Sequence, residues 1–216
     1  MKNINGWYLP DFDNLISKQA SKSTYPKSCY QQEIFDAALT FVTNFNQAVD
    51  IGANIGFHST RLGGLFKNVK AFEPSSINFE CLKQNTKSFA NIEIFHAGLG
   101  NISTELILEL PNDIDNCGAF SFVDFVGKTN EKIIEKVKVF TLDELDINPD
   151  FIKIDTQGFE KNVLLGSIET IKKTKPVILA EVAKKGPVKE LLDILQPIGY
   201  EISWASNSDK VFSFRG

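Results

Sequence analysis

The chain has 216 residues, of which 43% are hydrophobic and 23% are charged, and its formal net charge is −4. A chain of this length fits one domain around a single hydrophobic core. A mildly acidic protein offers no positive field to a polyanion, and only Arg61 and Arg215 carry the guanidinium fork that grips phosphate or guanine. We therefore expect no nucleic-acid partner.

The three cysteines, Cys29, Cys81 and Cys117, have no CxxC spacing, so the sequence predicts neither a disulfide framework nor a thiolate metal site. The N-terminal residues lack an apolar stretch suited to a signal peptide. No run approaches the roughly 18 apolar residues of a membrane span. These features predict a soluble, cytoplasmic protein, and they carry no signal for an oligomeric state.

Residues 1–46 precede the first predicted strand, and we expect them to form an N-terminal cap with a helical extension. The segment 31–45 has a helical pattern with Phe35 and Ala38 on its apolar side. The remaining residues, 47–216, form the expected main domain.

From residue 47 onward, short apolar runs alternate with helical patterns, which is typical of a mostly parallel sheet flanked by helices. The predicted strands are 48–52, 70–74, 92–98, 151–155 and 177–182. The predicted helices are 57–66, 75–89, 160–172 and 187–196. The sequence thus predicts an α/β fold.

Two further patterns complete the predicted fold. Between residues 102 and 140, the alternating segments LILEL and VKVF surround a polar middle, which indicates an added strand pair and loop. At the C-terminus, residues 200–205 and 211–216 are separated by the turn-rich SNSDK, which predicts a β-hairpin and a final antiparallel strand.

The loop 50–56, DIGANIG, joins the first predicted strand to a helix, at the sheet edge where open α/β sheets bind ligands. Gly52 and Gly56 permit unusual φ values and close approach of a ligand. Asp50 can accept a hydrogen bond or offset positive charge on a ligand, and Asn54 offers both a donor and an acceptor. The alternative is that the glycines only make a tight turn.

Glu73 ends the second predicted strand, 17 positions after Gly56, where an acid can accept both hydroxyl protons of a ribose. The small residues Ala97 and Gly98 follow the third strand and leave room for an adenine. The loop is GxxxG rather than the GxGxxG of nicotinamide-binding domains, which normally also continue with parallel βα units instead of a terminal hairpin. These features favour S-adenosylmethionine over NAD.

The fourth predicted strand delivers Asp155 to the same edge of the sheet, where a carboxylate facing the methyl donor is a candidate general base. Glu181 in the fifth strand is a second candidate. Glu160 is as well explained by a role at the start of the next helix. His58, just after the glycine loop, is a third catalytic candidate and is better placed than His96.

The segment TLDELD, residues 141–146, places three acids together, Asp143, Glu144 and Asp146. A solvated helix face explains this cluster better than a cation site does, and we expect no metal.

Five segments, VDIGANIGFHS, AFEPSSINFECLKQN, HAGLGN, TLDEL and IKIDTQGFEKNVLLG, resemble the FkbM-type methyltransferases from about Ala48 to Ala183. The resemblance implies a class I methyltransferase (Rossmann-like) sandwich, with a mostly parallel seven-stranded sheet that ends in an antiparallel hairpin. It also implies transfer of a methyl group from S-adenosylmethionine, typically to an oxygen of a sugar or natural-product scaffold.

By the same resemblance, the donor-binding motif falls on Asp50, Gly52, Asn54, Gly56 and Glu73. The acid of the family's IDxEGxE segment falls on Asp155, which we also count among the donor-binding residues. The family commonly has an acid two positions after that aspartate, whereas this chain has Gln157. Gln157 keeps hydrogen bonding but loses the charge, which would change the acceptor or reduce activity.

The leading hypothesis is therefore an O-methyltransferase acting on a hydroxyl-bearing small molecule or glycan. The alternatives are methylation of an amine on a small molecule or peptide, and a protein that binds S-adenosylmethionine without catalysis. An NAD-dependent oxidoreductase is disfavoured by the loop and the hairpin.

Overall fold

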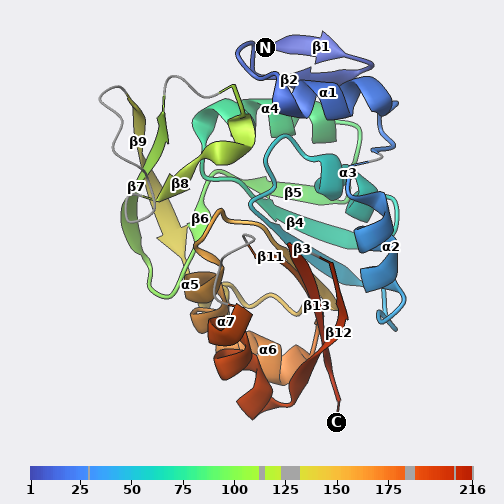
Figure 1. The fold of residues 1–216 in the computed structure, drawn as a ribbon, viewed down its shortest axis with the longest axis vertical. Coiled ribbons are helices and arrows are strands. Elements are labelled where there is room, and N and C mark those ends of the chain that lie inside the picture. Colours follow the sequence, from blue (N-terminus) through green and yellow to red (C-terminus); the bar gives the residue numbers. More distant parts are fainter. Residues whose placement is uncertain (29, 112–114, 123–131, 183–187, 207, 216) are drawn as a thin grey trace.

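The computed structural model describes every residue except 29, 112–114, 123–131, 183–187, 207 and 216. The main sheet of this part has seven strands (Figure 1). In spatial order they are β12 (Tyr200–Ala205), β13 (Asp209–Phe214), β11 (Val177–Glu181), β10 (Phe151–Ile154), β3 (Gln47–Ile51), β4 (Asn68–Phe72) and β5 (Ile92–Phe95). The strands from β11 to β5 pair in parallel, and β13 is antiparallel to both β11 and β12. The predicted α/β fold with a C-terminal antiparallel hairpin is confirmed.

Successive side chains of a strand point to opposite faces of the sheet, and in the buried strands the side chains on both faces are largely apolar. Helices therefore pack on both faces of this sheet. One face is covered by α2 (Gln32–Leu39), α3 (Phe57–Gly63) and α4 (Ser76–Thr86), and the other by α5 (Glu160–Leu165), α6 (Ile168–Thr174) and α7 (Val188–Leu195). In β10, Phe151 packs with the first group, and Ile152 and Ile154 pack with the second.

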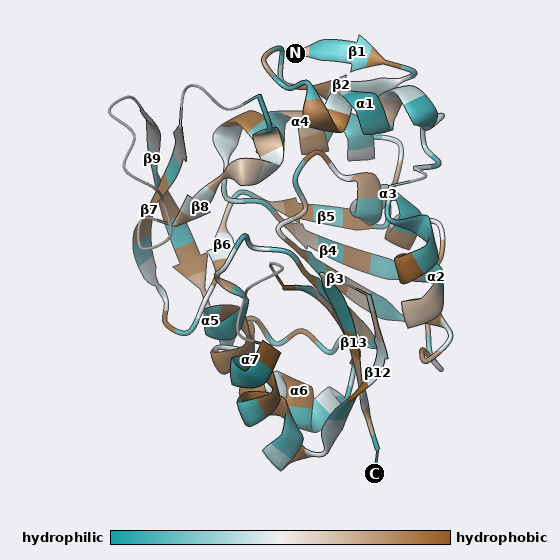
Figure 2. Ribbon diagram, in the orientation of Figure 1, coloured by the Kyte–Doolittle hydropathy of each residue, from teal (hydrophilic) through white to brown (hydrophobic). Residues whose placement is uncertain are grey.

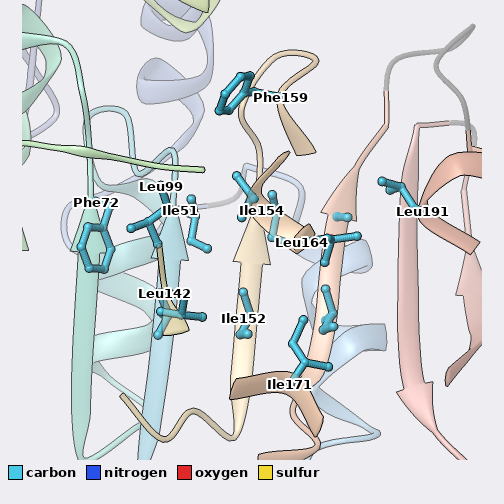
Figure 3. Packing of buried hydrophobic residues seen from close by; sticks show 14 of the residues in the cluster. Ile51, Phe72, Leu99, Leu142, Ile152, Ile154, Phe159, Leu164, Ile171 and Leu191 are labelled. Atoms are coloured by element: carbon cyan, nitrogen blue, oxygen red, sulfur yellow. The ribbon is translucent and has the colours of Figure 1, made fainter. Parts of the chain in front are cut away.

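The larger core cluster lies on the α5–α7 face (Figure 3). Ile51 and Ile154 from adjacent strands meet Leu164 of α5 and Ile171 of α6 there. Figure 2 shows apolar residues concentrated along the central strands, whereas β1 at the periphery is largely hydrophilic. No helix of the described residues is long and apolar enough to cross a membrane.

A smaller sheet stands beside the main one, at the left in Figure 1. Its strands, in spatial order, are β6 (Gly98–Leu99), β9 (Lys132–Phe140), β7 (Thr104–Pro111) and β8 (Ser121–Phe122). The antiparallel pair β7 and β9 confirms the strand pair predicted between residues 102 and 140. Short 3-10 helices are η1 (Cys117–Ala119), η3 (Asp143–Leu145) and η4 (Gln196–Ile198).

The N-terminal residues form a hairpin, β1 (Lys2–Ile4) and β2 (Trp7–Leu9), followed by α1 (Leu15–Lys22), and they lie over the end of the main sheet near α4 (Figure 1). Trp7 is completely buried and meets Phe57 of α3 edge-on, with ring centroids 4.6 Å apart. Asn85 of α4 accepts a hydrogen bond from the Tyr8 amide and donates one to the Tyr8 carbonyl.

Three predicted elements differ from the structure. The helix expected over 31–45 ends at Leu39, because the following residues close short turns instead. The strand expected over 92–98 stops at Phe95, and Gly98 already belongs to the smaller sheet. The helix expected over 160–172 is split near Gly166, where a side chain would lie 1.8 Å from the Gly100 carbonyl oxygen. The predicted start of the helix at 187 and the position of Cys29 lie outside the described residues.

Candidate functional site

A cavity of about 230 Å³ opens at the carboxyl ends of β3, β4, β10 and β11. This is the sheet edge at which α/β folds bind their ligands. On the side of the smaller sheet its lining includes the apolar residues Leu99, Leu108 and Phe122. On the side of β10 and β11 it is polar and includes Asp155 and Glu181. The cavity therefore suits a ligand with a flat apolar part and a charged part.

The glycine loop between β3 and α3 forms the floor of this cavity. Gly52 has φ +75°, and a Cβ on it would lie 1.8 Å from the backbone oxygen of Asp155, so only glycine fits. Gly56 has φ +96° and a Cβ there would lie 2.8 Å from a methyl of Leu82. Asn54 also adopts a left-handed conformation, with φ +53°. Such conformations cluster where a loop is shaped for a ligand.

Glu73 ties the glycine loop to the end of β4. Its carboxylate oxygens accept hydrogen bonds from the backbone amides of Asn54, at 2.7 Å, and Ser75, at 2.9 Å. Burial raises the pKa of Glu73 to about 7, and these amide donors partly offset that effect. Each carboxylate oxygen has a second lone pair, so Glu73 retains acceptor capacity toward the cavity that it lines.

Asn78 of α4 brings a second acceptor to the cavity lining. Its Nδ2 donates to the carbonyl oxygen of Cys117 at 2.8 Å, which fixes the orientation of the amide. Its Oδ1 is buried and has no hydrogen-bond partner among the described residues. A buried acceptor without a partner is costly, so this atom is suited to a donor group on a ligand.

Asp50 lies behind the loop and is not among the residues that line the cavity. It is fully buried, and Oδ2 accepts a hydrogen bond from the Ser59 hydroxyl at 2.6 Å. Lys153 stands opposite it on β10 and forms an ion pair with Oδ1 at 3.4 Å. The Asp50 carboxylate therefore balances the charge of the Lys153 ammonium from behind the glycine loop.

Lys153 reaches from the middle of a buried strand to the loop. Its ammonium donates to the Gly52 carbonyl oxygen at 2.8 Å and lies 3.7 Å from Asp155 Oδ2. Burial acts to lower the pKa of Lys153, but the Asp50 and Asp155 carboxylates outweigh it and raise the pKa above its usual value. The charged ammonium thus holds the ends of β3 and β10 together.

Asp155 and Glu181 lie at the polar side of the cavity, at the ends of neighbouring parallel strands. Asp155 Oδ1 accepts a hydrogen bond from Gln157 Nε2 at 2.7 Å, so Gln157 supplies a donor where an acid would repel. Burial, with the adjacent Asp155 carboxylate, raises the pKa of Glu181 to about 8.

His58 of α3 lines the cavity beside Tyr30. Its Nε2 lies 3.0 Å from Gln31 Oε1, an acceptor, which assigns the ring proton to Nε2. The imidazole stacks on Phe35, with ring planes 3° apart. Burial lowers the pKa of His58 well below its usual value, so the ring is neutral.

The N-terminal residues close the cavity from above, where Leu15, Ile16 and Tyr30 are among its lining. Asp13 is fully buried, and its carboxylate accepts from the amides of Ser17 and Cys117 at 2.9 and 2.8 Å. One side chain therefore joins the N-terminal segment to the segment after β7.

The structure brings most of the candidate residues to one cavity. Those that line it are Gly52, Asn54, Glu73, Gly98, Asp155, Glu181 and His58. Asp50, Gly56 and Ala97 are not among the residues that line it. His96 lies outside, with Nε2 at 3.1 Å from the Pro74 carbonyl oxygen and 3.3 Å from Glu135.

The other acids singled out in the sequence bind backbone amides or exposed side chains. Glu160 Oε1 accepts from the amides of Thr156 and Gly158, which is the helix-start role. Asp143 accepts from the first amides of α6. In the described ranges no group of three or more His, Cys, Asp or Glu is placed to hold a metal.

Three residues at the site were not predicted from the sequence: Lys153, Gln31 and Asn78. Lys153 could have been found, because a lysine in the middle of an apolar, buried strand is rarely buried without a charged partner. Gln31 and Asn78 carry no such signal, because their roles depend on contacts between distant segments.

The seven-stranded sheet with its reversed β13, together with the cavity at its carboxyl edge, defines a class I methyltransferase fold. The family model of the methyltransferase FkbM domain matches residues 50–202, and the chain belongs to this family. No curated protein sequence matches the chain.

Crystal structures with a similar fold include a methyltransferase FkbM from Methylobacillus flagellatus KT, with 23% identity and a TM-score of 0.51. The match covers 79% of this chain and 43% of that chain, so this chain spans less than half of that protein. A precorrin-6y C5,15-methyltransferase from Geobacter metallireducens GS-15 has 14% identity and a TM-score of 0.51, with 88% and 92% of the two chains covered. At these identities the likeness shows the fold alone.

S-adenosylmethionine is the cofactor of this methyltransferase family. The residues present fit it, because Gly52 leaves a cradle that a Cβ would fill and Asn78 Oδ1 is an acceptor without a protein partner. Glu73 and Asn78 would hold the ribose, and the apolar residues near Leu99 would enclose the adenine.

Proposed function

We propose that the chain transfers a methyl group from S-adenosylmethionine to a hydroxyl oxygen of a sugar or another hydroxyl-bearing small molecule or glycan. The observation that carries this proposal is that Asp155 and Glu181 line the same cavity as Gly52 and Glu73, which fit the donor. A hydroxyl group must lose a proton as its oxygen attacks, and a carboxylate beside the donor is suited to accept it.

When bound, the cofactor supplies an electrophilic methyl group on a sulfonium. In the transfer that we propose, the hydroxyl oxygen would gain the methyl group, S-adenosylhomocysteine would leave, and the hydroxyl proton would pass to the Asp155 and Glu181 carboxyl pair, so charge would balance. Alignment of the oxygen with the C–S bond supplies much of the rate enhancement. Asp155 is the first candidate for orienting the hydroxyl, because Gln157 and Lys153 hold its position. Glu181 is the second carboxylate, and His58, being neutral and bonded to Gln31, is the weaker candidate.

The proposed proton acceptor gives a pH dependence. Glu181 accepts a proton only when ionised, and burial raises its pKa to about 8. Turnover should therefore be low near pH 6 and rise as the pH increases through about 8. A pH–rate profile measures this, and Glu181→Gln should remove the rise.

We further propose that residues 1–46 act as a cap on the methyltransferase domain formed by 47–216. The cap residues Leu15, Ile16 and Tyr30 line the cavity, which supports a role in enclosing the donor and in contacting the acceptor.

The testing experiment is turnover with a labelled methyl donor and three acceptor panels: methyl glycosides and glycans, primary amines, and peptides. We expect label in the hydroxyl-bearing panel, with Asp155→Asn lowering turnover at least about 10-fold while leaving donor affinity within about two-fold. Label only in the amines or peptides would overturn O-methylation. That second candidate is favoured by the carboxylate pair, which also suits an ammonium group.

If the chain binds the donor but transfers no label to any of the three acceptor panels, it is a protein that binds S-adenosylmethionine without catalysis. Equal turnover by wild type and Asp155→Asn would remove Asp155 from the proposed role.

A further inference from the structure

Gln31 is the last residue before α2 and lies outside the segment matched by the methyltransferase family. Its backbone is left-handed, with φ +48°, which is uncommon for a residue other than glycine. A conformation of this kind persists when surrounding contacts favour it. The side-chain contacts of Gln31 with His58 and Glu181 are such contacts.

The Gln31 amide bridges two residues of the cavity. Its Oε1 lies 3.0 Å from His58 Nε2, and its Nε2 donates to Glu181 Oε2 at 3.5 Å. The three side chains come from the start of α2, from α3 and from the end of β11, so the contact joins the cap to α3 and to β11.

His58 and Gln31 are matched as hydrogen-bond partners in the structure. The imidazole is buried, stacked on Phe35 and neutral, so it carries one ring proton, and with Gln31 Oε1 at 3.0 Å from Nε2 that proton lies on Nε2. With Oε1 engaged in this way, the Nε2 group of the amide faces Glu181. Rotation of the amide by 180° would place two donors against each other at His58.

We propose that Gln31 is a positioning residue through which the N-terminal cap orients the Glu181 carboxylate toward the acceptor end of the cavity. This inference rests on the proposed function, in which Glu181 is a proton acceptor. The cap would thereby form part of the catalytic machinery as well as covering the donor.

Glu181 is surrounded by several charged or titratable groups in the described part of the chain. They are Lys153 from β10, Asp155 directly after β10, Asp209 from β13, and Tyr30 from the cap. Asp155 and Asp209 disfavour the ionised carboxylate, and Lys153 favours it. An amide hydrogen of Gln31 favours the ionised form too, since it donates to a charged oxygen.

The test is a carbon-13 NMR titration of the full chain, labelled at the glutamate side-chain carboxyl and assigned with Glu181→Gln. It needs neither donor nor acceptor, so it can be read whether or not O-methylation is observed. The variants are Gln31→Ala and Gln31→Glu, with Gln32→Glu as the control that adds the same charge at an exposed neighbouring side chain.

We expect Gln31→Glu to raise the Glu181 midpoint by about one pH unit, because a donor is replaced by a like charge. Gln31→Ala should raise the midpoint by a smaller amount, and Gln32→Glu should leave it unchanged. Equal shifts in the two glutamate variants would show a long-range charge effect and overturn the proposal. So would an unchanged midpoint in Gln31→Ala, which also provides the test if Gln31→Glu fails to fold.

Discussion

At the scale of single residues, Asn78 shows how a buried polar group indicates a ligand. One of its polar atoms is engaged by the Cys117 carbonyl oxygen, and the other, Oδ1, has no partner in the described part of the chain. A donor hydroxyl would satisfy it, and Glu73 lies in the same lining. Together they form an acceptor pair suited to a ribose.

Asn78→Leu should weaken binding of S-adenosylhomocysteine by about 3- to 10-fold, the value of one net hydrogen bond. Isothermal titration calorimetry measures this, with circular dichroism to verify folding. Asn68→Leu, at an exposed position near the start of β4, is the matched control and should bind as wild type does. A folded Asn78→Leu protein with unchanged affinity would refute the assignment.

Gln157 is the residue at which the chain departs from its family's usual acid. Its amide donates to Asp155, and its side chain is exposed. Gln157→Glu removes the donor to Asp155 and adds a negative charge beside the two carboxyl groups that line the cavity, which disfavours ionisation of Glu181.

We therefore expect Gln157→Glu to move the rise in the pH–rate profile upward by about half a unit, and less at high salt, because the site is exposed. Donor affinity should not change. Gln32→Glu serves as the charge control. A midpoint that stays in place or moves to lower pH would contradict this account of Gln157.

At the scale of elements, the glycine loop is held by close approach between two strands. Gly52 packs against the backbone oxygen of Asp155, and Lys153 donates to the Gly52 carbonyl oxygen. These contacts fix the conformation of the loop that we expect to hold the donor.

Gly52→Ala should lower the free energy of unfolding by at least about 2 kcal/mol, since it combines a left-handed alanine with a backbone clash. Urea denaturation measures this. Gly64→Ala is the control, because its φ is −80° and its nearest neighbour would be 3.5 Å away. Equal stability of Gly52→Ala and Gly64→Ala would show that the close approach is not required.

Element by element, the parallel strands and their helices could be predicted, because each buried strand is a continuous apolar run followed by a helical period. The N-terminal hairpin was missed although Asn5-Gly6 is a turn signal, with φ of +52° and +91° in the structure. Its strands are only three residues long and show no clear alternation. The break between α5 and α6 was missed because it depends on Gly100, a residue from another element.

At the scale of the whole molecule, the site is made by segments far apart in the chain. The glycine loop, Glu73 and Asp155 could be predicted together, because the carboxyl ends of neighbouring parallel strands meet at one edge. The cap could not be placed in this way. Its contact with the cavity depends on Asp13, which binds the Cys117 amide from more than a hundred residues away.

The same limit applies to Gln31 and Asn78, whose partners lie on other elements. Sequence patterns report which face of an element is apolar, and they do not report which polar groups meet across elements. We expect the contacts with the acceptor to depend on polar groups that meet across elements too, so the sequence patterns do not identify them.

The most direct test of the account is calorimetric titration of the full chain with S-adenosylhomocysteine and with NAD, in wild type and in Glu73→Gln. We predict one-to-one binding of S-adenosylhomocysteine, weakened at least about 10-fold in Glu73→Gln, because the substitution replaces an acceptor oxygen with a donor amide. NAD should give no binding. Binding of NAD alone, or S-adenosylhomocysteine affinity that is the same in both proteins, would contradict the donor site described for this fold.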